Sequence, residues 1–538
     1  MTNAQIAQHF ALLADLMELH EENPFKIKSY AYAGRTLKKI NEPLASLSIE
    51  ELEKLEGVGK AIAAKIFHLV NSGKLELLEK YLSITPIGVV DMLQLKGIGP
   101  KKIAQLWKTL EIESIGELEY ACNENRLVEL KGFGAKTQEN ILQQIQFIKQ
   151  SANQFLWANL EELALEILAE IQEQYPTCLI STSGDYRRKE ITLEKIDFLM
   201  ALEDESKQKK LIEKYQQFPV RFSFCTTDDF YLTLLQQSSD DEHFGFLSYK
   251  IDSNKKYSSE KEIYEDAGFP FIAPELRDNK VEWNLVENNL LSEIIQLQDI
   301  KGVVHTHTKY SDGTNTLKEL ATYCKEQGFE YLVVSDHSKS AFYASGLKEE
   351  EIQRQHQEIE QLNQALFPFK IFKSIESDIL YNGDLDYDVE ILASFDLVIA
   401  SVHSQLKMDE NKSTERIIKA IENPYTTILG HLTGRLLLSR QGYPIQHKKI
   451  IDACAANKVC IELNANPYRL DIDYSWLQYC QEKNVLISIN PDAHNLRGVH
   501  DIRYGVYAAA KGGLLKQHTL NTLTKDNFER YLQSQKRT

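Results

Sequence analysis

The feature that most constrains this 538-residue chain is a regular alternation of short apolar runs and helix-like segments beyond residue 297. The alternation repeats about seven times over roughly 240 residues, which predicts parallel strands joined by crossing helices. Such strands close into an α/β barrel, whose active site lies at the carboxyl ends of the strands. The predicted strands begin near Gly302, Tyr331, Phe369, Leu397, Thr427, Val459 and Val485.

Side chains that bind metal ions end or follow most of these strands. The first strand ends in His305-Thr-His307, and we expect both imidazoles to point the same way because strand side chains alternate between faces. Asp312 follows in a turn-like Ser-Asp-Gly, from which its carboxylate can reach back. One His-x-His is weak evidence, but a repeated strand-end position is not expected by chance. The further candidates are Asp336, His337, Glu376, His403, His431, Asp492 and His494.

Composition sets broad limits on the class of protein. With 43% hydrophobic and 26% charged residues, the chain is ordinary for a soluble protein, and its length predicts about two to four domains. It has no long apolar run and no secretion signal, so we expect a cytoplasmic protein without a membrane partner. Its seven cysteines are scattered without a Cys-x-x-Cys pair, which favours reduced thiols over disulfides or a zinc finger.

The charge is unevenly distributed along the chain. The net charge of −17 argues against a generic nucleic-acid binder, because affinity for phosphate comes largely from Lys and Arg. Residues 151–300 carry 15 Lys and Arg against 29 Asp and Glu, so most of the negative excess lies there.

A Gly-hydrophobic-Gly turn occurs three times in the first 150 residues, at 57–59, 97–99 and 132–134. Each turn lies between helical patterns, follows a leucine and precedes a lysine. Glycine allows tight turns and close approach to a ligand, and the next helix begins with free N–H groups that suit a phosphate. One such motif is more often a simple turn, but three copies favour helix-hairpin-helix binding to the DNA backbone. The predicted DNA-binding residues are Gly57, Gly59, Lys60, Gly97, Gly99, Lys101, Gly132, Gly134 and Lys136.

Residues 1–80 resemble the lyase-like N-terminal domain of X-family DNA polymerases. The resemblance rests on the turn at 57–59 and on the basic and aromatic segment 23–35. Lys65 occupies the place of the lysine that forms a Schiff base with abasic sugars in eukaryotic members. Such chemistry needs a lysine of lowered pKa, and simple phosphate binding by Lys65 is the alternative. By the same resemblance, residues 81–150 are fingers-like with two hairpins, 151–235 are palm-like and 236–297 are thumb-like.

The resemblance implies a polymerase site that needs three clustered carboxylates for two divalent ions. In this chain the corresponding residues are Lys195, Asp197 and Arg221. At about 4 Å and an effective dielectric of about 20, repulsion between unit charges costs about 4 kcal/mol, and a divalent ion doubles it. We therefore predict that the polymerase site no longer binds metal and that polymerase activity is lost.

Residues 298–538 resemble the PHP (polymerase and histidinol phosphatase) domain of bacterial X-family polymerases. The resemblance implies a metal-ligand set of His305, His307, Asp312, His337, Glu376, His403, His431, Asp492 and His494. Such a set would hold two to three divalent ions, with Mn²⁺ favoured and Zn²⁺ or Fe²⁺ as alternatives. Asp336 is expected to orient a liganding histidine, and Arg435 to contact phosphate or the scaffold.

The sequence thus predicts a multidomain α+β and α/β protein with a helical hairpin region, a palm- and thumb-like region and a distorted (βα)7 PHP barrel. We expect a 3′–5′ DNA exonuclease, with abasic-site cleavage or 3′-phosphatase activity as variants, in base-excision-type repair. Its expected partners are gapped, abasic or single-stranded 3′ DNA and other repair proteins, in a bacterial nucleoid and as a monomer. The alternatives are an active gap-filling polymerase with PHP proofreading, a histidinol-phosphate-type phosphatase and a non-catalytic scaffold.

Overall fold

The computed structural model divides the chain into two compact units, Met1–Ala152 and Asn153–Thr538. No helix in the part of the chain that it describes is long and apolar enough to cross a membrane. The finer domain boundaries predicted from the sequence stay predictions. The described residues are 1–55, 57–110, 112–115, 118, 121–122, 127, 130, 132–151, 154–252, 255–341, 344–406, 408–438 and 441–535.

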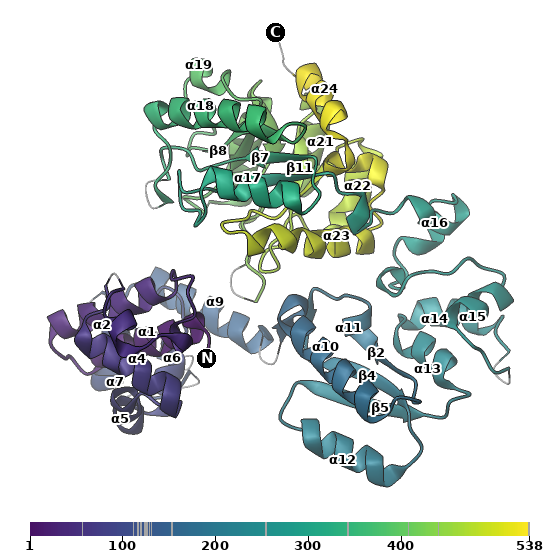
Figure 1. The fold of residues 1–538 in the computed structure, drawn as a ribbon, viewed down its shortest axis with the longest axis horizontal. Coiled ribbons are helices and arrows are strands. Elements are labelled where there is room, and N and C mark those ends of the chain that lie inside the picture. Colours follow the sequence, from purple (N-terminus) through teal and green to yellow (C-terminus); the bar gives the residue numbers. More distant parts are fainter. Residues whose placement is uncertain are drawn as a thin grey trace. The chain divides into compact units, whose positions relative to one another are not determined.

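The first unit is built of helices around one apolar core (Figure 1). Helix α1 begins at a Thr2 capping box and buries Phe10, Leu13 and Met17, which recur at helical spacing along one face. The principal helices are α1 (Asn3–Leu19), α2 (Pro24–Leu37), α3 (Ile49–Leu52), α4 (Lys60–Ser72), α5 (Glu76–Ile84), α6 (Ile87–Met92), α7 (Pro100–Leu110) and α9 (Ala135–Ser151).

The second unit begins with a mixed α/β region. Its three-stranded sheet has the order β2-β4-β5, with β4 (Ile196–Ala201) antiparallel to β2 (Ile180–Ser183) and parallel to β5 (Val220–Cys225). Strand β4 is buried throughout, and the rings of Phe198 and Phe222 stack at 5.2 Å between β4 and β5. Helix α10 (Trp157–Gln174) contacts this sheet.

A group of short helices follows the sheet: α13 (Phe230–Gln237), α14 (Asp241–Ser248), α15 (Glu260–Asp266) and α16 (Glu282–Glu287). The carboxylate of Glu260 ties them to the sheet region. It accepts hydrogen bonds from Arg277 at 2.6 Å and from Arg187 at 2.9 Å, and Arg277 is fully buried. A buried charge needs such a partner, so these residues fix the short helices against the sheet region.

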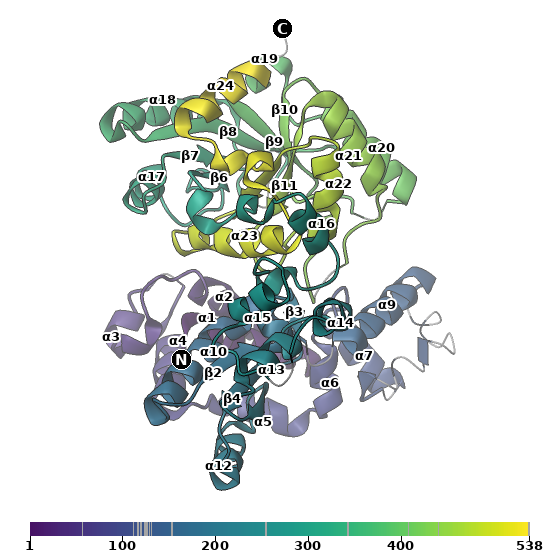
Figure 2. The same cartoon turned by 90° about the vertical axis from the view of Figure 1, so that its right-hand side faces the viewer.

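The rest of the chain forms the predicted barrel of seven parallel strands in the order β6 to β12. Helices surround the sheet, with α17 and α18 on one side and α20, α21 and α22 on another (Figure 2). The strands are β6 (Gly302–Thr306), β7 (Tyr331–Val334), β8 (Lys370–Asp378), β9 (Leu397–Ser401), β10 (Thr426–Leu429), β11 (Cys460–Asn464) and β12 (Ile487–Asn490). The helices are α17 (Leu317–Glu326), α18 (Glu349–Leu366), α20 (Glu410–Glu422), α21 (His447–Asn457), α22 (Leu477–Glu482), α23 (Ile502–Lys511) and α24 (Lys525–Gln535).

The barrel is almost closed between its first and last strands. At the carboxyl ends, Thr306 pairs with Ala493 in a parallel bridge, and the His307 N–H donates to the Ala493 carbonyl at 2.9 Å. At the other end, buried Asn521 accepts from the Ile489 N–H at 2.7 Å and returns a bond to the Ile489 carbonyl. Phe528 of α24 stacks on Tyr331, and it belongs to the apolar cluster that also contains strand residues of β6 to β11.

Candidate metal centre and nucleic-acid interface

The nine histidines and acids predicted as metal ligands converge at the carboxyl ends of the barrel strands. They form three overlapping groups whose ligand atoms lie within 4.8 Å of one another, and His431 joins them through Glu376. The loop that carries Asp312 passes close to the backbone of His307. Only glycine fits there, because a Cβ at Gly313 would lie 2.4 Å from the His307 carbonyl oxygen. The groups are His307, Asp312, His337 and His494; His305, His307 and Asp492; and His337, Glu376 and His403.

Glu376 is the hub of the closed end of the site. It is fully buried inside β8, and its carboxylate faces five imidazoles. Oε1 lies 3.0 Å from His431 Nε2 and 3.1 Å from His403 Nε2, while Oε2 lies 2.9 Å from His337 Nδ1. One carboxylate with histidines on both oxygens can bridge two neighbouring ions.

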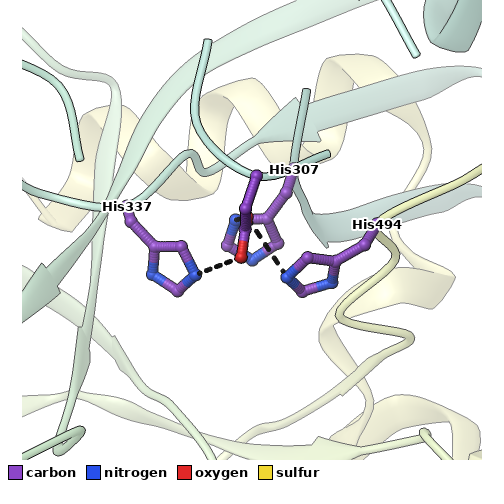
Figure 3. A group of neighbouring side chains, drawn as sticks. His307, His337 and His494 are labelled. Atoms are coloured by element: carbon purple, nitrogen blue, oxygen red, sulfur yellow. Dashed lines mark ion pairs between the residues drawn. The ribbon is translucent and has the colours of Figure 1, made fainter. Parts of the chain in front are cut away.

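Asp312 lies at the open end of the site. Its carboxylate is 3.4 Å from His494 Nε2, 3.6 Å from His337 Nε2 and 3.8 Å from His307 Nδ1. The three imidazoles turn toward a common point (Figure 3). The side chains of Asp312 and His494 are 35% and 37% exposed, whereas Glu376 is inaccessible. The site is therefore open to solvent on the side of Asp312 and His494.

Asp492 joins the two ends. Its Oδ1 lies 3.0 Å from His307 Nε2, 3.6 Å from His305 Nε2 and 3.8 Å from His494 Nδ1. Asp492 has a φ of +51° and His305 has a φ of +65°, a left-handed conformation that costs free energy for residues with a Cβ. Both strained residues face the site.

The left-handed conformation of His305 corrects one detail of the sequence interpretation. We expected His305 and His307 to face the same way through regular strand alternation. The pairing of β6 with β7 instead shifts register between Val303 and Thr306, and β6 ends at Thr306. The two imidazoles still meet, with ring centroids 5.3 Å apart, but an irregular strand end brings them together.

Two carboxylates that the sequence interpretation missed orient these histidines from behind. His305 Nδ1–H donates to buried Glu462 at 2.6 Å, and His403 Nδ1–H donates to Asp378. Each hydrogen bond fixes the tautomer and turns Nε2 toward Glu376. Glu462 lies inside β11, the one strand to which we had assigned no site residue; a glutamate in the apolar run 459–463 was the available signal.

Asp336 and Arg435 hold loops, and the contacts of Asp336 differ from those that we expected. Asp336 is buried and accepts from the Thr308 N–H at 2.8 Å and from the Ser311 hydroxyl at 2.5 Å, so it holds the segment before Asp312. In the described residues its hydrogen bonds come from this loop and Gln355 rather than from a histidine. Arg435 donates to Asp473 at 2.6 Å and to backbone carbonyls, which is the scaffold contact of the two alternatives.

The electrostatics of the centre follow from burying opposite charges together. Burial opposes ionisation of Glu376, but His403, His305 and His337 outweigh it and hold its pKa well below the usual range. Burial likewise opposes protonation of His337, yet Glu376 and Asp312 raise its pKa to about 11.

His307 behaves in the opposite way. Burial, together with the neighbouring His494 and His337, lowers its pKa to about 3. It therefore presents a neutral imidazole at physiological pH, the form in which histidine binds metal ions.

The residues present fit divalent metal ions. Buried atoms of the predicted ligands that lack a hydrogen-bond partner among the described residues include His305 Nε2, His307 Nδ1, Glu376 Oε2 and His431 Nδ1. Unsatisfied buried polar atoms are costly, and an ion would satisfy them. A mixed imidazole and carboxylate donor set suits divalent metal ions of the first transition row.

The palm-like region holds a different arrangement. Asp197 on β4 lies directly opposite Arg221 on β5, and Arg221 Nε donates to Asp197 Oδ1 at 2.6 Å. Burial raises the pKa of Asp197, while Arg221 and more distant Lys195 oppose that rise. Both residues of the pair line an open cavity, together with Asp185 and Asp241.

The three predicted hairpin turns share one geometry. The first glycine of each, Gly57, Gly97 and Gly132, has a φ of +79°, +84° and +90°. The second glycine begins the next helix: the Ile62, Lys102 and Thr137 N–H groups donate to the carbonyls of Gly59, Gly99 and Gly134. The hydrophobic residue between the glycines is buried in each turn, and Lys60, Lys101 and Lys136 are exposed.

The start of helix α4 can accept an anion. Gly59 is its N-cap and offers no side-chain acceptor, so the first N–H groups lack a side-chain cap. Lys65 lies half-buried one turn further along this helix. Its role as a lyase residue stays a prediction.

Family comparisons match three parts of the chain. Residues 1–75 match a helix-hairpin-helix domain, residues 89–146 match a SAM-like helix-hairpin-helix tandem and residues 304–466 match the PHP domain. These matches agree with the hairpins and the barrel that the structure shows.

A relative from Bacillus subtilis strain 168, "DNA polymerase/3'-5' exonuclease PolX", is 30% identical over 99% of both chains. This chain belongs to the PolX family. A probable phosphatase of Thermoanaerobacter is 26% identical over 43% of this chain and 94% of that protein. DNA polymerase lambda of Arabidopsis thaliana is 25% identical over 38% of this chain and 36% of its own length.

PolX membership agrees with the predicted order of hairpin region, mixed α/β region and PHP barrel. It supports DNA as a partner and a phosphoesterase or polymerase activity, with divalent metal ions as cofactors. Which of these activities the chain retains depends on its two carboxylate sites.

Proposed function

We propose that this PolX chain is a metal-dependent 3′–5′ DNA exonuclease whose active site is the PHP centre. The observation that carries the proposal is the convergence of six histidines and three acids at the ends of the barrel strands. The printed name of the Bacillus subtilis relative includes the same activity. Abasic-site cleavage and 3′-phosphatase activity would use the same centre.

The nine predicted ligands, among them the carboxylates of Glu376, Asp492 and Asp312, would hold two to three divalent ions, with Mn²⁺ favoured. When bound, such ions lower the pKa of a coordinated water and stabilise charge on a phosphodiester. Around them, Glu462 and Asp378 hold His305 and His403 in one tautomer. The buried end excludes bulk water, and the Asp312 end admits the substrate.

We further propose that the palm-like site does not polymerise. Arg221 occupies the position of the third carboxylate and pairs with Asp197, the acid that remains. An arginine stays protonated throughout the physiological range, so it repels a metal ion at every working pH. Asp185 and Asp241 line the same cavity and would repel a triphosphate.

The hairpins are proposed to hold the DNA backbone while the barrel cleaves it. Their exposed lysines and glycine turns contact phosphate without reading sequence, which suits a substrate defined by an end or a gap. Gapped, abasic or single-stranded 3′ DNA is therefore the proposed substrate class, with other repair proteins as further partners.

The test digests an oligonucleotide labelled at either end with the full chain and Mn²⁺. Digestion from the 3′ end gives a ladder of shortened products from the 5′-labelled strand and single labelled nucleotides from the 3′-labelled strand. Primer extension with dNTPs on a gapped template should give no template-dependent product. Extension that Asp197→Ala abolishes would refute the loss of polymerase activity. Turnover of histidinol phosphate but not of DNA would favour the small-molecule phosphatase.

A further inference from the structure

We propose that the loop Asn466–Leu470, which follows β11, recognises the DNA end, with Arg469 binding a phosphate oxygen and Tyr468 stacking on an unpaired base. The inference rests on the proposed exonuclease function and names how the same site holds its substrate. It concerns residues outside the nine predicted ligands.

Arg469 is placed to meet a substrate phosphate. Its Nε lies 3.9 Å from Asp492 Oδ2, and among the described residues it is the one lysine or arginine that pairs with any of the nine predicted ligands. This contact is too long for a hydrogen bond, so the guanidinium keeps donors for another acceptor. Its side chain is 21% exposed, which leaves it accessible beside the site.

A positively charged side chain at the centre would help an anionic substrate to bind. Glu376, Asp492 and Asp312 line the site, and Glu462 and Asp378 lie behind it, so the site is rich in carboxylates. A phosphodiester is an anion and needs positive charge in addition to metal ions. The planar guanidinium matches a phosphate with two parallel hydrogen bonds.

Tyr468 supplies the second half of the recognition. Its side chain is 54% exposed, although its backbone is held at both ends. The Tyr468 N–H donates to Asn466 Oδ1 at 3.0 Å, and the Leu437 N–H donates to the Tyr468 carbonyl at 2.7 Å. An exposed ring on an ordered backbone gives a flat face on which a base can stack without reading its identity.

The loop is a built element of the barrel. Arg435 donates to the carbonyls of Arg469, at 2.9 Å, and Leu470, so its guanidinium fixes two consecutive peptide groups of the loop. Leu470 belongs to a buried apolar cluster with Tyr504 and Ala508 of α23, against which Trp157 also packs. The loop thus presents the side chains of Tyr468 and Arg469 from a fixed backbone.

Two features indicate that the ligand of Tyr468 and Arg469 is single-stranded DNA. A cation and an aromatic ring on adjacent residues match the repeating phosphate and base of a nucleic-acid strand. A small phosphate monoester without a base would use Arg469 and leave Tyr468 without a role. The predicted specificity is therefore for an unpaired nucleotide at the strand end.

The experiment compares full-length Arg469→Gln and Tyr468→Ala with the wild type and with matched controls. Arg497→Gln changes an exposed arginine of the same barrel, and Tyr381→Ala removes another exposed tyrosine. Steady-state kinetics use a single-stranded oligonucleotide and bis(p-nitrophenyl) phosphate, which has no base. Binding of thymidine 5′-monophosphate to the Mn²⁺-loaded proteins is measured by calorimetry, and metal content is measured by elemental analysis.

We expect Arg469→Gln to raise KM for both substrates and to weaken thymidine monophosphate binding about 10-fold to 100-fold, at unchanged metal content. Tyr468→Ala should raise KM for the oligonucleotide about 10-fold and leave bis(p-nitrophenyl) phosphate unaffected. The two control variants should behave as the wild type.

Three outcomes separate the inference from its alternatives. If Arg469→Gln loses metal but binds the nucleotide normally once reloaded, Arg469 positions Asp492 and the inference is wrong. If Tyr468→Ala affects neither substrate, the stacking half is wrong. If the wild type cleaves no DNA while thymidine monophosphate binding still depends on Arg469, the exonuclease proposal fails and the phosphate site stands.

Discussion

Two buried carboxylates, Glu376 in the barrel and Asp197 in the palm-like sheet, show how the neighbours of an acid decide its chemistry. Glu376 faces five imidazoles, each of which can release its proton and offer a lone pair. Asp197 faces Arg221, which cannot release its proton. Both acids lie on strands whose side chains line a site. Glu376 is placed to share a metal ion with its histidine neighbours. Asp197 is already paired with the positive charge of Arg221.

The largest expected effect comes from removing histidines at the barrel centre. His305→Ala combined with His307→Ala should lower exonuclease activity at least about 1,000-fold, because both imidazoles contribute to the centre. Gapped-DNA binding should remain, and primer extension should be absent before and after the change. His500→Ala, at an exposed position of the barrel, is the control. Persisting nuclease activity would place the chemistry elsewhere.

The hairpins should contribute to binding independently of both carboxylate sites. Lys60→Ala, Lys101→Ala and Lys136→Ala together should weaken gapped-DNA binding about 100-fold and lower the salt slope by about one unit per lysine. Cleavage of bis(p-nitrophenyl) phosphate should not change. Anisotropy titrations over a range of salt concentrations measure the slope, with exposed Lys74→Ala as the control. An unchanged slope would argue against phosphate contacts at these turns.

A carboxylate behind a ligand should matter less than the ligand itself. Glu462→Gln keeps a hydrogen-bond acceptor for His305 Nδ1–H but removes its charge, so metal affinity should fall about 10-fold to 100-fold. Metal titration of the chelator-treated protein measures this affinity. Glu422→Gln, exposed on α20, should have no effect. Equal affinities in both variants would mean that Glu462 does not support the site.

Metal should also stabilise the barrel in a way that depends on pH. Burial opposes protonation of His403 and His494, but their acidic neighbours raise the two pKa values to about 9 and about 8. The stability that these protons give the metal-free protein is present below about pH 6.5 and is lost as the pH rises through the folded values.

Saturating Mn²⁺ should therefore raise Tm by about 5 °C, and by more at about pH 8.5 than at about pH 6.5. Scanning calorimetry with and without a chelator makes the measurement. Histidine substitution at the barrel centre should remove the metal effect, which would exclude the palm-like site as its source. An increase in Tm on Mn²⁺ binding that becomes smaller with increasing pH would contradict the assignment of the metal site to the barrel centre.

The smallest effect is expected at the palm-like pair. Arg221 is 62% exposed, so Arg221→Ala should cost at most about 1 kcal/mol of unfolding free energy. Urea unfolding measures this cost. The Arg221→Ala variant should bind no more Mn²⁺ than the parent chain, because Asp197 is the one acid among Lys195, Asp197 and Arg221. An additional Mn²⁺ ion in Arg221→Ala that is lost again when Asp197→Ala is added would show that the palm-like site still binds metal.

Much of the barrel was predictable because its signals are local. Each apolar run is short and is followed by a helical pattern, and the side chains after it reveal which end carries the site. Glu462 was missed because it interrupts an apolar run and its role depends on His305, 157 positions away in the sequence. The loop-holding role of Arg435 depends in the same way on residues about 35 positions away.

The sequence by itself determined which charged and metal-binding side chains each region carries: histidines and acids at barrel strand ends, and Lys195, Asp197 and Arg221 in the palm-like region. The tertiary structure decided which nitrogen of each imidazole faces the centre, which end of the site is open and which partner Asp197 takes. Residue type sets charge and donor atoms, and strand ends can be read locally. Orientation, burial and pairing depend on contacts between distant segments, which form only when the barrel and the sheet fold.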